Sequence, residues 1–110
     1  MVVATTRKLP PAEMAARAGE VAGLLKTLAH PARLQLACAL AEGEYAVGEL
    51  GERLGIRQPS LSQQLGALRE AGVVATRREA KQIFYRLSQD KAARLIEALY
   101  SIYCGPEQQL

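Results

Sequence analysis

Two short amphipathic segments joined by a three-residue link restrict the fold of this chain more than any other feature. Residues 47–54 form the first segment, the link covers residues 55–57, and the second segment begins near Gln58 or Pro59 and ends before Gly72. Leucines recur every three or four residues along the second segment, which is the period of one helix face. Two helices joined by so short a glycine-containing turn predict a helix-turn-helix, whose second helix usually enters the major groove of DNA.

After this unit the pattern changes to one that is typical of β-strands. Residues 73–77 and residues 82–87 are rich in β-branched and aromatic side chains, and a turn is predicted at residues 79–81 between them. A hairpin that directly follows a helix-turn-helix is a wing. The fold class predicted from these elements is mainly α with a β-hairpin, a winged helix-turn-helix.

Three further helices are predicted around this unit. Pro11 begins the first, and the His30–Pro31 junction separates it from a second helix that runs to about Glu42, because a residue before proline avoids the helical region. Ser88 is predicted to cap the last helix. The apolar stripe predicted for the second helix consists of Leu34, Ala37, Cys38 and Ala41.

The first helix carries more apolar surface than one core contact needs. Its stripe consists of Met14, Ala18, Val21, Leu25 and Leu28. Because a chain of 110 residues without Trp buries a modest core, we expect a homodimer that pairs through the first and last helices. We also expect residues 1–10 to form a flexible tail and residues 11–110 to form a single domain.

The charge of the chain suits a polyanionic partner. Fourteen Lys and Arg residues against eleven Asp and Glu residues give a formal charge of +3, and the basic side chains gather at residues 77–86. No apolar run approaches the roughly 18 residues that a membrane span needs, so we expect a cytoplasmic protein. The sequence contains no CxxC motif and no catalytic constellation, which makes a small thiol redox enzyme the weaker alternative.

The second helix of the helix-turn-helix presents a polar face that suits base reading. Its leucines must face the domain, which leaves short or amide side chains outside. Gln can pair with the edge of adenine, and Ser can bond to bases or phosphates. Arg57 lies just ahead of this helix, where it could reach a phosphate. On its own such a face is usually only a solvated surface, but its place between a tight turn and a basic hairpin favours DNA recognition.

Three segments of the chain then match a known family. They read LLKTLAHPARLQLACAL, VGELGERLGIRQPSLSQQLGALREAGVV and TRREAKQIFYRL. They resemble the ArsR/SmtB family of homodimeric winged-helix repressors, and the resemblance implies that the helix from Gln58 to Ala71 reads the operator while the hairpin contacts flanking DNA. The residues that we predict to bind DNA are Arg57, Gln58, Ser60, Ser62, Gln63, Gln64, Arg77, Arg78, Lys81 and Gln82.

Many members of that family respond to metal ions, but this chain has a poor set of ligands. Its single histidine, His30, lies at the start of a predicted helix, and the stretch YAVGEL contains neither Cys nor His where some metal-sensing members bind their ion. Zinc-like ions need three or four ligands at defined spacing. We therefore predict no metal site and no cofactor.

The two cysteines are the remaining candidates for a sensor. Cys38 lies on an apolar stripe, where free cysteine is commonly buried packing, whereas Cys104 lies off its stripe at a helix end and is expected to be accessible. The contexts LACAL and LYSIYC resemble the persulfide-sensing BigR/SqrR branch of the family. That resemblance implies that reactive sulfur species act as the inducer by linking Cys38 to Cys104 and so release operator DNA upstream of sulfide-detoxification genes. A metal inducer, or none, remains the alternative.

Overall fold

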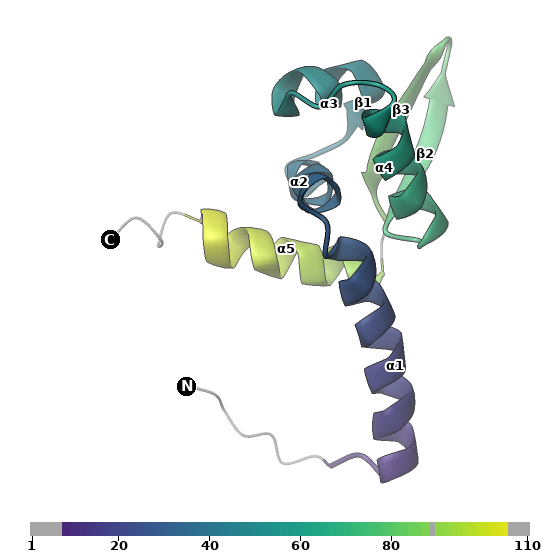
Figure 1. The fold of residues 1–110 in the computed structure, drawn as a ribbon, viewed down its shortest axis with the longest axis vertical. Helices are drawn as coiled ribbons and strands as arrows, with labels where there is room; N and C mark the ends of the chain where they lie inside the picture. Colours follow the sequence, from purple (N-terminus) through teal and green to yellow (C-terminus); the bar gives the residue numbers. More distant parts are fainter. Residues whose placement is uncertain (1–7, 89, 106–110) are drawn as a thin grey trace.

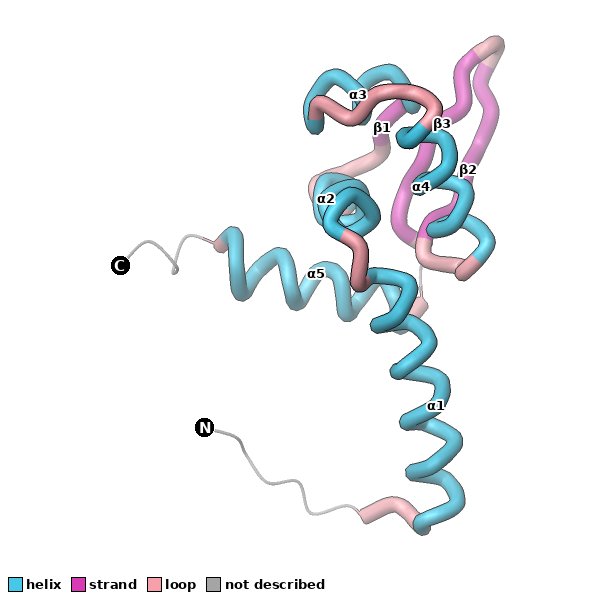
Figure 2. Tube along the Cα trace, in the orientation of Figure 1, coloured by secondary structure: helices cyan, strands magenta, loops and turns pink. Residues whose placement is uncertain are grey.

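The computed structural model describes residues 8–88 and 90–105, and its elements follow the predicted order with one addition (Figure 1 and Figure 2). The elements are α1 (Pro11–Leu28), α2 (Pro31–Leu40), β1 (Tyr45–Ala46), α3 (Val47–Leu54), α4 (Ser60–Glu70), β2 (Val74–Glu79), β3 (Gln82–Leu87) and α5 (Lys91–Cys104). The predicted fold class, a mainly helical winged helix-turn-helix, is confirmed. Helix α2 ends two residues before the predicted Glu42, and α4 begins at Ser60, just after the predicted start.

Helix α2 lies at the centre of the molecule. In Figure 1 it is seen nearly end-on, between α5 on one side and α3 and α4 on the other. The largest fully buried side chains come from α2, α3, α4, the start of the wing and α5, and they are Leu36, Leu50, Leu65, Leu68, Val73 and Ile96. The stripe predicted for α2 was wrong in one respect, because Leu36 is 0% exposed whereas Leu34 is 37% exposed.

The wing is part of a three-stranded antiparallel sheet in the order β1-β3-β2. Strands β2 and β3 pair from Val74 with Leu87 to Glu79 with Gln82, so that only Ala80 and Lys81 remain in the turn. Sequence reasoning missed β1, which pairs Tyr45 with Tyr85. A strand of two residues is too short to show an alternation, and it exists only because β3 offers an edge to pair with.

N-cap side chains start α2 and α5, and the cap predicted for α5 was wrong. Asp90, not Ser88, caps α5, since its Oδ1 accepts hydrogen bonds from the backbone N–H groups of Ala92 at 3.0 Å and Ala93 at 3.3 Å. The Ser88 hydroxyl lies 2.8 Å from the same Oδ1 and 2.7 Å from the Gly72 carbonyl oxygen. Ser88 therefore positions the capping residue and fixes the end of the wing to the end of α4.

Helix α1 projects away from the rest of the fold (Figure 1). Only Leu28, at its end, is buried, while Met14, Val21 and Leu25 are each about half exposed. None of the described helices is long and apolar enough to cross a membrane. The predicted tail falls largely on residues 1–7, which lie outside the described residues, and it stays a prediction.

Candidate DNA interface and dithiol site

The helix-turn-helix consists of α3, the turn at residues 55–59 and α4. Gly55 ends α3 in the left-handed region, at φ 68° and ψ 26°, where a side chain would be strained. Gly51 lets the two helices approach closely, because a Cβ atom there would lie 3.0 Å from Leu61 Cδ2 and 3.3 Å from the Ile56 carbonyl oxygen. Leu61, Leu65 and Leu68 are buried, so the orientation of α4 is set by the core.

The opposite face of α4 is available to a ligand. Ser62 and Gln63 are exposed, and Ser60 and Gln64 are half-buried at the margin of this face. Gln58, which we predicted to bind DNA, has a structural task as well, because its Oε1 accepts a hydrogen bond of 3.0 Å from the backbone N–H of Ser62. Its amide oxygen is thus engaged in starting α4, and its NH₂ group remains to bond elsewhere.

The basic side chains of the interface differ in their surroundings. Arg77 donates to both carboxylate oxygens of Glu44 at 2.8–3.0 Å and to Glu79 at 2.8 Å, and its guanidinium lies 4.6 Å from the centroid of the Phe84 ring. The hydrogen bond from Arg77 lowers the pKa of Glu44, and the carboxylates raise the pKa of Arg77. Arg77 is therefore charge-compensated.

The other predicted phosphate contacts have their charges uncompensated. Arg57, Arg78 and Lys81 are exposed, and they form no ion pair with any residue in the part of the chain that the structure describes. Gln82, at the start of β3, is also exposed. Arg77 therefore braces the wing against Glu44 in the loop before β1, and Arg78 and Lys81 near the turn are the better candidates for phosphate contacts.

The two cysteine thiols are free and differ in exposure. Cys38 is half-buried on α2 and packs against the core, whereas Cys104 is exposed as the last residue of α5, as we predicted. Burial raises the pKa of Cys38, and the charge of Cys104 raises it further. Helices α2 and α5 pack against each other, so the fold places the two predicted cysteines on neighbouring elements.

A pocket of about 420 Å³ opens beside Cys38. Its lining residues are Gln35, Cys38, Ala39, Glu42, Arg53, Leu54 and Tyr100. Glu42 links three elements there: its carboxylate accepts hydrogen bonds from Tyr100 on α5 at 3.0 Å, from Arg53 on α3 at 2.7 Å and from Tyr45 on β1 at 3.3 Å. Sequence reasoning gave this carboxylate no role.

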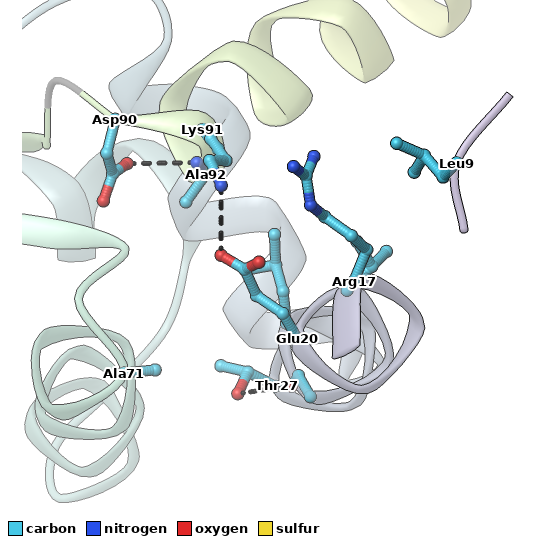
Figure 3. Close-up of a pocket in the computed structure, with 11 residues that line it drawn as sticks. Leu9, Arg17, Glu20, Thr27, Ala71, Asp90, Lys91 and Ala92 are labelled. Atoms are coloured by element: carbon cyan, nitrogen blue, oxygen red, sulfur yellow. Dashed lines mark hydrogen bonds and ion pairs between the residues drawn. The ribbon is translucent and has the colours of Figure 1, made fainter. Parts of the chain in front are cut away.

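A second hollow, of about 650 Å³, lies between α1, the start of α5 and Ala71 after α4. Figure 3 shows Arg17 and Glu20 of α1 facing this space, with Lys91 of α5 3.4 Å from the Glu20 carboxylate. The hollow adjoins the exposed side of α1. It is an open surface feature with apolar and charged walls.

The residues that could bind a metal ion are dispersed. His30 Nδ1 accepts a hydrogen bond of 3.1 Å from the backbone N–H of Ala32, so this ring caps α2. Among the described residues no group of three or more His, Cys, Asp or Glu side chains converges on one point.

Comparison with known proteins gives consistent matches. Residues 30–76 match the family model described as bacterial regulatory protein, arsR family. The biofilm growth-associated repressor of Agrobacterium fabrum is 72% identical over 103 residues, which are 94% of this chain and 88% of that protein.

Solved structures extend the likeness to three dimensions. The crystal structure of the transcriptional repressor BigR from Xylella fastidiosa has a TM-score of 0.84 at 60% identity, over 92% of this chain and 100% of that one. The homodimeric winged helix-turn-helix domain Mb0332 from Mycobacterium bovis has a TM-score of 0.70 at 31% identity, over 96% and 94% of the two chains. These relatives are transcriptional regulators and not enzymes.

Proposed function

Because the chain belongs to the ArsR family of bacterial regulatory proteins and is a BigR-like DNA-binding repressor, we propose that reactive sulfur species control its operator affinity by linking Cys38 to Cys104. The observation that carries this proposal is the pair itself, one half-buried and one exposed free thiol on α2 and α5, two helices that pack against each other. Loss of operator binding would derepress genes for sulfide oxidation and detoxification. The regulator acts where its operator is, in the cytoplasm.

The DNA-bound form is a homodimer in this proposal. Each protomer places α4 in a major groove and its wing along the flanking backbone, with Arg57, Arg78 and Lys81 on phosphates and Ser62, Gln63 and Gln64 toward base edges. The half-exposed apolar residues of α1 support the dimer, as do Ile102 and Tyr103 of α5, which are 52% and 76% exposed. Large apolar side chains exposed together commonly mark an interface. The relative from Mycobacterium bovis is itself described as homodimeric.

A charge placed in the middle of the apolar face of α1 should separate the protomers. Leu25→Glu should weaken dimerisation by about 100-fold or more, because the carboxylate would have to be buried without a partner. Sedimentation at micromolar concentration should then show the 11.9 kDa chain, where the wild type shows about twice that mass. Ala16→Glu is the matched control, since it adds the same charge on the opposite side of α1. A dimer that tolerates Leu25→Glu would show that this face is not the interface.

The redox step is balanced with a low-molecular-weight persulfide, RSSH, as the oxidant. The exposed Cys104 thiolate attacks the outer sulfur of RSSH, which gives a Cys104 persulfide and releases RSH. The Cys38 thiolate then attacks the inner sulfur of that persulfide, which forms the disulfide and releases hydrogen sulfide. Two thiols and one RSSH thus yield one disulfide, one RSH and one H₂S. If each cysteine first becomes a persulfide, their condensation with loss of H₂S leaves a trisulfide.

Serine variants test this proposal directly. Cys38→Ser and Cys104→Ser should bind operator DNA like the reduced wild type, because serine is close in size to cysteine and neither thiol lies on α4 or the wing. After treatment with glutathione persulfide the wild type should lose affinity by about 10- to 100-fold, a common size for allosteric coupling, while both variants should keep theirs. Fluorescence anisotropy with intact-mass analysis measures both effects. If both variants still release DNA, the cysteines are packing residues, and only the sensor assignment fails.

A further inference from the structure

We infer that the Glu42 junction, defined as Glu42 with its partners Tyr100, Arg53 and Tyr45, is the element through which a bridge between α2 and α5 changes the position of the helix-turn-helix. This inference rests on the sulfur-sensing function proposed above and names how that site is coupled to DNA. It concerns three hydrogen bonds to one carboxylate, each from a different element of the fold.

The junction joins the end of the sensor to the start of the DNA-binding unit. Tyr100 lies on α5 four residues before Cys104, and Arg53 lies in the last turn of α3. Glu42 lies two residues beyond the end of α2, the helix that carries Cys38. The guanidinium of Arg53 is also held 4.7 Å from the centroid of the Tyr45 ring, so that its position is fixed from two sides. In the dithiol form the last turns of α5 are thus tied to α3 through one side chain.

Bridge formation imposes the separation and torsion of a disulfide on Cys38 and Cys104. The two sulfurs are unbonded in the structure, and a direct disulfide requires Cα atoms within about 7 Å and a fixed torsion about the bond. Drawing Cys104 to Cys38 shifts the last turn of α5 over α2, and Tyr100 shifts with it because the two residues are only about 6 Å apart along the helix axis. A hydrogen bond of 3.0 Å weakens steeply when its donor moves by half an ångström or turns away. Glu42 and Arg53 then lose their link to α5.

Removing the hydrogen bond between the Glu42 junction and α5 should change the operator affinity of the dithiol form alone. Tyr100→Phe removes the hydroxyl and keeps the ring, so it should weaken operator binding by the dithiol form about fivefold, a size suited to a partly exposed hydrogen bond to a carboxylate. The bridged form has already lost this bond, and its affinity should not change. The bridge should still form in this variant. The dissociation constant of the bridged form divided by that of the dithiol form should therefore fall about fivefold.

Tyr45→Phe is the matched control. It removes a second hydroxyl from the same carboxylate without touching α5, so it should change the affinities of both redox states by the same factor and leave their ratio as in the wild type. The probe is a DNA duplex selected from random sequences by the reduced wild-type protein, and the bridge is made with glutathione persulfide and verified by intact mass. Hydrogen exchange of the α3 amides should change on bridging in the wild type and in Tyr45→Phe, and should change little in Tyr100→Phe.

The outcomes separate this inference from the function on which it rests. If the wild type does not form the bridge, or forms it and keeps its DNA affinity, both are overturned. If the wild type releases DNA and Tyr100→Phe shows the same ratio of dissociation constants, the sensor stands and the Glu42 junction is overturned. An equal loss of the ratio in both tyrosine variants also overturns it, since the carboxylate would then serve only to hold the fold.

Discussion

Raising the salt concentration from about 50 mM to about 200 mM should weaken operator binding by about 10³-fold. In the proposed interface three exposed cations per protomer, Arg57, Arg78 and Lys81, would make roughly six phosphate contacts in a dimer, and each contact would release a condensed counterion. The logarithm of the association constant should therefore fall against the logarithm of salt concentration with a slope of about −5. Anisotropy titrations across this salt range measure the slope directly.

The wing provides a control within two adjacent residues. Arg78→Gln should reduce the magnitude of the slope by about 2, because it removes one phosphate contact from each protomer. Arg77→Gln should change the slope little, because Glu44 and Glu79 already compensate the charge of Arg77. A slope that falls equally in both variants would show that Arg77 leaves its carboxylates for DNA, and the brace assigned to it would then be wrong.

Leu36→Ala should lower the free energy of unfolding by about 3 kcal/mol. Leu36 lies on the central helix α2 and is fully buried, so its truncation loses apolar burial and leaves a cavity among side chains from several elements. Urea unfolding at fixed protein concentration measures this free energy. The dependence of the free energy on urea concentration should be the same in the variant and the wild type.

The neighbouring leucine of the same helix is the natural comparison. Leu34 is 37% exposed, and Leu34→Ala should cost less than about 1 kcal/mol under the same conditions. Equal costs for the two variants would contradict the burial of α2 described here. The comparison of the two variants also tests the apolar stripe predicted from helical periodicity, which contained Leu34, against the packing in the structure, in which Leu36 is buried.

Local patterns in the sequence were sufficient to predict the helix-turn-helix and its wing. The leucine period of α4, the left-handed Gly55 and the β-branched and aromatic residues of the hairpin are each local features of the sequence. The exposed polar face of α4 follows from the same period, since the leucines must be inside. The start of α5 was misplaced because Ser88 and Asp90 are both good caps, and only the turn of the chain after β3 decides between them.

The contacts that were missed join residues far apart in the chain. Glu44 and Arg77 are 33 residues apart, and Glu42 and Tyr100 are 58 apart. The periodicity of a sequence does not reveal such pairs, because the local sequence around an exposed Glu or Arg is the same whether or not the side chain has a distant partner. The cysteine pair is different in kind: resemblance to a family identified it, and the structure adds how each thiol is buried and what surrounds it.

The projecting helix α1 makes this regulator sensitive to its own abundance. In a lone chain the turns of α1 before Leu24 are held by local helix propensity and by the exposed Glu20–Lys91 ion pair, and Gly19 and Gly23 lower that propensity by about 1 kcal/mol each relative to Ala. A helix that gains its packing from a second copy is folded to the extent that chains are paired. Unpaired chains would expose this segment to proteases, so degradation would remove them first and the cell would retain protein that is ready to occupy both halves of an operator.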